Sequence, residues 1–314
     1  MLARGVVAMV ETCGLVALAP LVIGLMRTVR CRIEGRVGPP VYQPWRDIRK
    51  LLTKRRSRPQ SASVVFALAP VVLAATTLVV IVLVPVVTTS PVLATGSDLF
   101  AVVFLLLLGS VVMALAALDT GSAIGGMGAS RIMVVVALTE PALLVAILAL
   151  AAPVKSSSLS VIVTGTLAHP GWVASPQRLL SFAAFVIVIL AESGRMPVDN
   201  PATHLELTMM NEALILEYAG PDLALVSLAE SLRFSVLVVL LANFFAPWGI
   251  ARSMSPVPVL IAGLALIVKI GAIAVAIGAG EVVSAKLRLF RVPELLAGAF
   301  TLSVLAVLSA LVIA

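Results

Sequence analysis

Long runs of hydrophobic residues, separated by shorter polar segments, dominate this chain. Runs of about 20 apolar residues are long enough to cross the hydrocarbon core of a bilayer as helices. Continuous runs also argue against a membrane barrel, whose strands alternate between hydrophobic and polar residues. The pattern therefore predicts about eight transmembrane helices, of which the fifth has the shortest apolar run, at residues 5–26, 64–88, 99–118, 132–152, 179–191, 223–246, 257–280 and 293–314.

The basic residues predict which side of the membrane each connecting segment faces. Eleven Lys and Arg residues lie between Arg27 and Arg58, and loops rich in Lys and Arg stay in the cytoplasm. This orientation places the N-terminus outside and, after eight crossings, the C-terminus outside as well. The chain is then a single integral membrane domain over residues 1–314, with inner loops at 27–63, 119–131, 192–222 and 281–292.

Composition agrees with an all-α, polytopic membrane protein. Hydrophobic residues make up 61% of the chain and charged residues only 12%, with a mean hydropathy of +1.16, whereas soluble domains carry about a quarter charged residues. The net charge of +7 is explained by the basic inner loops. No basic motif interleaved with aromatic residues is present, so a nucleic-acid partner is not expected.

The first inner loop contains a predicted amphipathic helix. Gly38-Pro39-Pro40 favours a turn, and from Trp45 onward the apolar residues recur at helical spacing with Arg and Lys between them, at Trp45, Ile48, Leu51 and Leu52. Such a helix is expected to lie in the plane of the inner membrane interface. A simple electrostatic anchor to anionic lipid explains the same basic residues equally well.

The second inner loop, Asp119 to Arg131, is rich in glycine. It does not match a phosphate-binding loop, because no Lys-Ser/Thr follows the glycines and no strand precedes them. A flexible connection or close packing between helices is expected instead.

The third inner loop concentrates acidic residues. The chain has 15 Asp and Glu residues, and seven of them lie between Glu192 and Glu230. Asn200-Pro201 predicts the start of a helix of about five turns that ends at Gly220. This acidic helical loop between helices five and six is apolar over most of its circumference. We therefore expect it to pack inside protein, where its acids need partners; a solvated acidic helix is the alternative.

Several ionisable residues fall inside predicted spans. A charge at the centre of a bilayer costs at least about 2.5–3.5 kcal/mol, so such residues usually have a function. Glu140 and Lys269 have no partner nearby in the sequence, which indicates proton movement or pairing across helices. Glu230 and Arg233 are spaced to pair on one helix face. Cys13 and Cys31 are too few for a metal cluster, and no metal or catalytic site is legible.

Three motifs carry a resemblance to a known family. Gly35-Arg-Val-Gly-Pro-Pro40, Thr139-Glu140-Pro141 and Ala191-Glu192-x-x-Arg195-x-Pro197-x-Asp199-x-Pro201 resemble the membrane subunit that joins the two arms of respiratory complex I, NADH dehydrogenase subunit 1. Residues 203–209 and 285–296 look more like the sister branch. That branch comprises subunit 4 and component C of membrane-bound [NiFe] hydrogenases of the formate hydrogenlyase and hydrogenase-4 type.

The resemblance implies a non-catalytic coupling subunit of an oxidoreductase complex in the cell inner (plasma) membrane. It would dock the soluble electron-transfer arm on its inner face and link redox chemistry to proton translocation. The cavity or quinone-like site and docking residues would be Arg36, Glu192, Arg195, Asp199, Glu206 and Glu217. The proton path would include Glu140, Glu192, Glu230 and Lys269.

The resemblance also implies partners and cofactors. This chain would bind no cofactor itself, while partner subunits would carry iron–sulfur clusters and a nickel–iron centre. Expected partners are hydrogenase large and small subunits, a ferredoxin-like subunit and antiporter-like membrane subunits. The alternative is the quinone-site subunit of a proton-pumping NADH:quinone oxidoreductase. A stand-alone transporter is disfavoured, because no inverted repeat relates the two halves of the chain.

Overall fold

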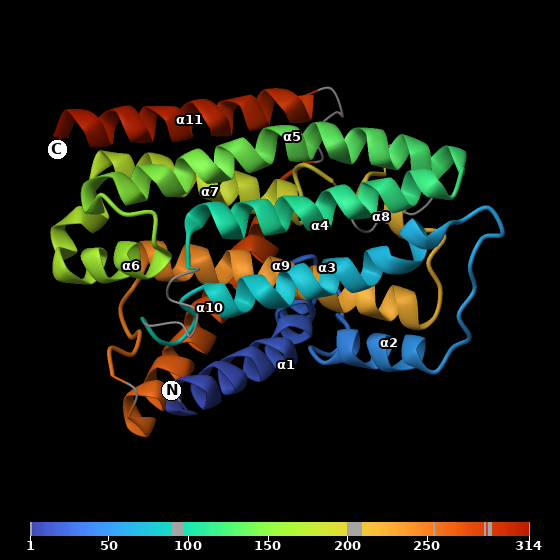
Figure 1. Ribbon diagram of the computed structural model, residues 1–314, viewed down its shortest axis with the longest axis horizontal. Helices are drawn as coiled ribbons and strands as arrows, with labels where there is room; N and C mark the ends of the chain where they lie inside the picture. Colours follow the sequence, from blue (N-terminus) through green and yellow to red (C-terminus); the bar gives the residue numbers. More distant parts are fainter. Residues whose placement is uncertain are drawn as a thin grey trace.

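The computed structural model describes residues 2–89, 97–199, 209–253, 255–285, 287 and 291–313. Over these residues the fold is all-α, as predicted, and only isolated bridges join extended segments. The helices, shown in Figure 1, are α1 (Leu2–Ile33), α2 (Gln43–Leu52), α3 (Val64–Leu83), α4 (Leu99–Asp119), α5 (Ala123–Ala151), η2 (Ala152–Val154), α6 (Leu159–Ala168), η3 (Pro170–Ala174), α7 (Pro176–Glu192), α8 (Asn211–Ile215), α9 (Pro221–Phe245), α10 (Pro256–Val283) and α11 (Val292–Ile313).

Seven helices within the described residues are long and apolar enough to cross a membrane, namely α1, α3, α4, α5, α9, α10 and α11. The predicted fifth span corresponds to α7, which has 17 residues and, at 1.5 Å per residue, extends about 26 Å. In Figure 1, α7 ends well short of the right-hand ends of α4 and α5. Helix α1 begins and α11 ends at the same left-hand end, as expected for eight crossings. Which side of the membrane that end faces stays a prediction.

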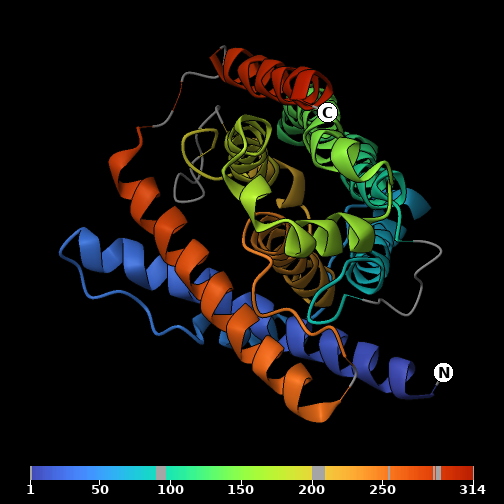
Figure 2. The ribbon, with the colours of Figure 1, turned by 90° about the vertical axis from the view of Figure 1, so that its left-hand side faces the viewer.

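Helix α9 lies at the centre of the bundle. All residues from Leu232 to Phe244 are buried, because α9 contacts helices on several sides, including α1, α2, α3 and α7. Apart from Arg233, Ser235 and Asn243 this stretch is apolar on all sides, as expected for a fully enclosed helix. Figure 2 shows α1 and α10 crossing obliquely beside the more parallel helices of the rest of the bundle.

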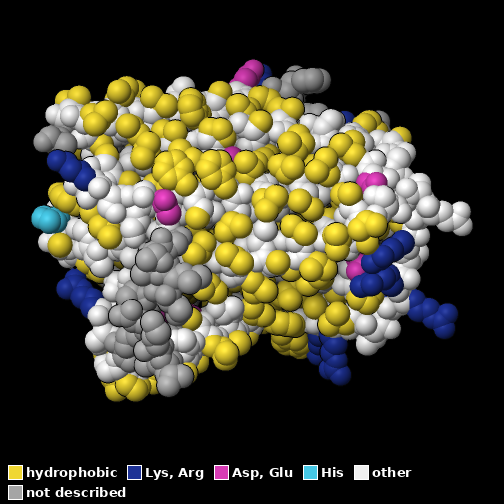
Figure 3. All heavy atoms as spheres, viewed as in Figure 1, with side chains coloured by type: hydrophobic (Ala, Val, Ile, Leu, Met, Phe, Trp, Pro, Cys, Tyr) yellow, Lys and Arg dark blue, Asp and Glu magenta, His cyan; other side chains and the backbone are white. Residues whose placement is uncertain are grey.

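The outer surface matches a membrane protein. In Figure 3 hydrophobic side chains cover most of the face between its two ends, and Lys and Arg side chains gather toward those ends. This distribution exposes apolar groups where hydrocarbon would surround them and keeps most exposed cations at the headgroup level. The chain is therefore a multi-pass membrane protein.

The glycine-rich segment predicted as an inner loop at 119–131 is mostly helical. Helix α5 begins at Ala123, so only residues 120–122 separate it from α4. A Cβ atom added at Gly128 would lie 2.6 Å from the Cβ of Ala213. The glycine thus permits close packing between α5 and α8, and of the two expected explanations, close helix packing is the one found.

The ends of several other helices also differ from the predicted span boundaries. Helix α1 continues to Ile33 and α10 to Val283, so both enter segments predicted as inner loops, whereas α3 already ends at Leu83. The ten-residue helix α6 lies in a segment where the hydrophobic pattern predicts no span. Helices continue past the apolar run because their backbone hydrogen bonds do not require hydrophobic side chains.

From Met209 onward, where the structure describes it, the acidic helical loop contains less helix than predicted. The expected five-turn helix is represented by α8, Asn211–Ile215, and Met209 precedes it without helical structure. Its expected start at Asn200-Pro201 lies outside the described residues. Between Met209 and Gly220 the sequence pattern overestimated the helical structure, because apolar residues on all sides indicate burial without fixing helical structure.

The predicted amphipathic helix is confirmed as α2, but its setting differs. Pro44 and Ile48 are buried, and the helix packs against α1 and α9, where the indole Nε1 of Trp45 donates to the carbonyl oxygen of Ala17 at 3.0 Å. Its axis points in nearly the same direction as that of α3 in Figure 1. A helix in the plane of the interface would instead cross the spans, so tertiary packing overrides the interfacial orientation.

The turn before α2 sits directly on α1, which makes Gly24 sensitive to substitution. An added Cβ would lie 1.8 Å from the carbonyl oxygen of Val41, and this is backbone that cannot swing away. We expect Gly24→Ala to cost at least about 1–3 kcal/mol of stability, measured as a lower thermal midpoint in detergent. Gly14→Ala on the same helix is the control, because its Cβ meets nothing within 4 Å. Equal midpoints for the two variants would contradict the close contact.

Candidate functional site

The C-terminal end of α7 fixes two of the predicted functional side chains. Glu192 is the last residue of α7, and the backbone N–H of Arg195 donates to the carbonyl of Leu190 at 2.8 Å. Gly194 adopts a left-handed conformation, with φ of +56°, and an added Cβ there would lie 2.1 Å from Nδ2 of Asn211. This is a glycine-terminated helix end, and it holds Glu192 and Arg195 in fixed positions.

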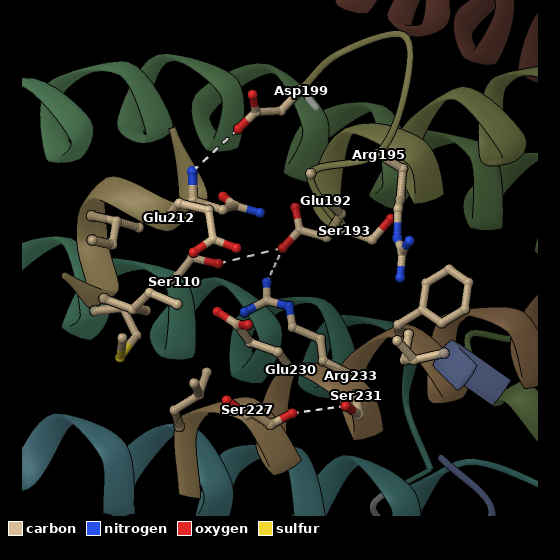
Figure 4. A pocket seen from close by; sticks show the side chains of 18 of the residues that line it. Ser110, Glu192, Ser193, Arg195, Asp199, Glu212, Ser227, Glu230, Ser231 and Arg233 are labelled. Carbon is tan, nitrogen blue, oxygen red and sulfur yellow. Dashed lines mark hydrogen bonds and ion pairs between the residues drawn. The ribbon is translucent and has the colours of Figure 1, made fainter. Parts of the chain in front are cut away.

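A cavity of about 330 Å³ lies beside this helix end. Helices α1, α2, α3, α4, α5, α7, α8 and α9 all contribute to its wall, and Figure 4 shows many of the lining side chains. Its apolar lining comes from Ile, Leu, Val, Met and Phe residues. Its ionisable lining comprises Arg27, Asp47, Glu192, Arg195, Asp199, Glu212, Glu230 and Arg233.

Arg233 of α9 joins two carboxylates from different helices. Its guanidinium forms an ion pair with Glu192, and one of its nitrogens lies 3.6 Å from Oε1 of Glu140. The hydroxyls of Ser110 and Thr139 lie 3.4 and 3.3 Å from the two oxygens of Glu192. The side chains of these three charged residues are at most 10% exposed. These side chains form a carboxylate–guanidinium–carboxylate row. It runs from Glu192 at the cavity wall through Arg233 to Glu140 on α5.

In this row, the attraction between opposite charges and the cost of burying those charges are of similar size. At an effective dielectric of about 20, two unit charges 3.6 Å apart attract by about 4–5 kcal/mol. Burial costs several kcal/mol per ion, so neither contribution dominates. Among the described residues, neither oxygen of Glu140 accepts a hydrogen bond. Protonation of one carboxylate therefore changes how strongly the other holds Arg233, which is the property needed for passing charge along the row.

A second buried charge cluster lies behind Arg195. The guanidinium of Arg195 lies 3.3 Å from Oε1 of Glu281. It also stacks over Phe234, with its central carbon 5.5 Å from the centre of the ring. Arg30 approaches the other oxygen of Glu281 at 3.8 Å. Burial holds the pKa of Arg195 below its usual range, and the Glu281 carboxylate opposes that shift. The cluster ties the helix end of α7 to α1 and α10.

Asp199 and Glu230 occupy different positions around the cavity. One carboxylate oxygen of Asp199 accepts from the backbone N–H groups of Met210 and Asn211 at 3.1 and 3.4 Å, so Asp199 caps the start of α8. Glu230 borders the cavity and stays accessible there. Figure 4 places its side chain close to that of Arg233.

Four of the predicted residues do not join these clusters. The side chain of Arg36 is 78% exposed and pairs with Glu34, and Glu217 is also exposed. Lys269 lies on α10, which contributes nothing to the cavity wall. Glu206 lies outside the described residues. The structure thus gathers Glu192, Arg195, Asp199 and Glu230 around one cavity, and Glu140 is connected to it through Arg233.

Sequence analysis missed two charged partners of the candidate site. Arg233 was expected to pair with Glu230 on its own helix, but it forms ion pairs with Glu192 and Glu140. Glu281 was not singled out at all. A signal was present, because an acid in the last turn of a helix is disfavoured by the helix dipole and therefore indicates a nearby cation.

No group of three or more His, Cys, Asp and Glu residues that could hold a metal ion occurs in the described part of the chain. The site is instead a polar cavity connected to buried ion pairs. Such an arrangement can bind a small molecule, hold a partner surface or conduct protons between carboxylates.

Comparisons with known proteins give the site a context. A family model described as NADH dehydrogenase matches residues 6–314. Hydrogenase-4 component C of Escherichia coli is 34% identical over 248 residues, covering 79% of this chain and 77% of that protein. Formate hydrogenlyase subunit 4 of the same organism is 31% identical over 303 residues, covering 96% and 97%.

A third relative belongs to the NADH-quinone oxidoreductase of Syntrophotalea carbinolica. This subunit is 30% identical over 246 residues, covering 73% of this chain and 72% of that protein. Among solved structures, a chain of the membrane-bound sulfane sulfur reductase, an archaeal respiratory membrane complex, has a TM-score of 0.83 at 20% identity. That likeness covers 98% of this chain and 99% of the other, so the two share a fold. The resemblance found in the sequence is confirmed.

Proposed function

Because this chain belongs to the NADH dehydrogenase family, we propose that it is the membrane-arm coupling subunit of a membrane-bound [NiFe] hydrogenase of the formate hydrogenlyase or hydrogenase-4 type. In this role it docks the soluble electron-transfer arm and links electron transfer to proton translocation. Near end-to-end similarity to formate hydrogenlyase subunit 4, over 96% of this chain, supports the branch. The single observation that carries the coupling role is the charged row of Glu192, Arg233 and Glu140.

The proposed proton route starts in the cavity. Glu192 faces the cavity, where a proton taken up during electron transfer neutralises its carboxylate. Arg233 then loses its first anionic partner and lies 3.6 Å from the carboxyl group of Glu140. The resulting shift in charge favours release of a proton carried by Glu140 farther along the membrane arm. Glu230, at the same cavity, is the neighbouring acid that feeds or buffers this exchange.

The proposed docking surface is the inner face around the same cavity. Arg36 and Glu217 are exposed there and are available to contact a soluble partner that carries iron–sulfur clusters. The buried ion pair between Arg195 and Glu281 stabilises this face, because it holds the C-terminal end of α7 against α10. In this proposal the nickel–iron chemistry takes place in the partner subunits. This chain positions those subunits on the membrane and provides the charged side chains of the proton route.

A second function is favoured by the cavity itself. Its volume of about 330 Å³ lies in the range of small-molecule sites, and it combines an apolar lining with a few polar groups. A quinone ring is a ligand of that kind. Similarity to the NADH-quinone oxidoreductase relative supports the same alternative, a quinone-site subunit of a proton-pumping oxidoreductase.

Purification of the native assembly in a mild detergent separates these functions. We expect the chain to co-elute with a nickel- and iron-containing subunit and with iron–sulfur proteins, and the preparation to evolve or consume hydrogen. Co-elution with flavin, with NADH oxidation that depends on added quinone, would favour the alternative. Elution of this chain alone under conditions that keep other respiratory complexes intact would contradict both.

A further inference from the structure

Helix α10 is the least enclosed of the seven candidate spans within the described residues. Only 22% of its most apolar window is buried. It contacts α1 and α9 through one narrow stripe of buried residues, namely Ala262, Leu266, Ile270, Ala274, Gly278 and Glu281. Figure 2 shows it as an oblique helix at the margin of the bundle. Most of its surface is therefore left for lipid or for another protein.

The uncovered surface of α10 has two different sides. One carries bulky side chains, all exposed, namely Val257, Leu260, Ile261, Leu264, Val268 and Val275. The other consists of Lys269 and of the small residues Ala272, Ala276 and Gly280, which follow it at helical spacing. Ala265, one turn before Lys269, instead faces Gly249 of this chain. We call this second set the small-residue face. Its members are exposed or half-buried, and a Cβ added at Gly280 would meet nothing within 4 Å.

Lys269 is a charge without a counterpart on this face. It is the fourteenth of the 28 residues of α10, so it lies about 20 Å along the helix from either end. Its four-carbon stem is too short to bring the ammonium group to the headgroups. Within the described residues its ammonium group forms no ion pair and no hydrogen bond. Left in lipid, it would cost at least about 2.5–3.5 kcal/mol.

We propose that the small-residue face of α10 packs against a transmembrane helix of another membrane subunit, which carries an Asp or Glu at the depth of Lys269. Small residues let two helix backbones approach closely in a membrane. A facing carboxylate removes the cost of the lone charge and fixes the depth at which the helices meet. The bulky side of α10 then remains for lipid.

This inference goes beyond the proposed function, because α10 contributes nothing to the cavity wall. It assigns Lys269 to pairing across helices, one of the two roles expected from its sequence position. It holds equally if the assembly is a hydrogenase or a quinone-reducing complex, so its failure and that of the proposed function are distinguishable.

Charge variants in the native complex test the proposal first. In complexes purified in mild detergent, Lys269→Glu is expected to lower the amount of one co-purifying membrane subunit at least about tenfold, because facing like charges strongly disfavour association. Lys269→Arg should retain that subunit. Undiminished recovery of every membrane subunit with Lys269→Glu would overturn the pairing.

A second measurement covers the case in which Lys269→Glu prevents folding. A photo-crosslinking amino acid is placed at Ala276 on the small-residue face and, as a matched control, at Val268 on the bulky side, each with Lys269 intact. Irradiation of native membranes should join Ala276, but not Val268, to another membrane subunit with an acidic residue in its span. Crosslinks to lipid alone, or to a second copy of this chain, would overturn the proposal.

Discussion

Replacing Arg233 by methionine is expected to abolish redox-linked proton translocation and to lower the stability of the protein by about 3–5 kcal/mol. Removing one partner of a buried ion pair leaves an uncompensated charge, and losses of this size follow. Here the cost is shared by two acids, Glu192 and Glu140, which both face Arg233. Proton uptake by inverted membrane vesicles and the thermal midpoint in detergent measure the two effects.

A compensating variant separates charge from packing. Arg233→Met combined with Glu192→Gln removes one cation and one anion, so stability should recover substantially while proton translocation stays absent. Glu140→Gln and Glu192→Gln alone should leave the complex assembled and weaken coupling. Coupled turnover at the normal level in both single variants would rule out a proton role for the row. Equal instability of Arg233→Met with and without Glu192→Gln would rule out the electrostatic account.

Replacing Arg195 by methionine is expected to release the soluble arm from membranes. Among the described residues, Glu281 would keep only Arg30, at 3.8 Å, as an ion-pair partner, and the buried carboxylate would no longer hold the end of α7 in place. The chain following that helix end, which includes Asp199 and the start of α8, would shift with it. The measurement is the fraction of the soluble subunits that sediments with washed membranes.

Arg30→Met is the matched control for this variant. Arg30 contacts the same carboxylate, but at a longer distance, and its side chain is 23% exposed, so its loss should release much less of the soluble arm. Equal retention of the arm with Arg195→Met and with the unaltered protein would refute the bracing role of Arg195.

Much of the fold was predictable because hydrophobic length and helical spacing act locally along the chain. Long apolar runs located the spans, and the spacing of Trp45, Ile48 and Leu51 located α2. The orientation of α2 was not predictable, because it depends on contacts with α1 and α9, which lie far away in sequence. Gly128 was interpreted from composition, and only the approach of Ala213 reveals its packing role.

Part of the site was also predictable, because some of its residues stand out in the local sequence. A dense set of acids after a span marked Glu192 and Asp199, since charge near a membrane helix needs an explanation. The partner of Glu192 could not be derived from sequence spacing, because Arg233 is 41 residues away and reaches it only through the packing of α7 beside α9. The pairing of Arg195 with Glu281 spans 86 residues and was equally hidden.

The short length of α7 has an electrical consequence. Its C-terminal end stops well inside the extent of α4 and α5 (Figure 1), and the cavity occupies the space beyond Glu192. A polar recess at that depth thins the insulating layer locally, so a transmembrane voltage falls over a shorter distance there. A charge that moves along the membrane normal through this region then performs more work against the voltage than the same displacement in the surrounding lipid, where about 2.3 kcal/mol per charge and 100 mV is spread over the full bilayer.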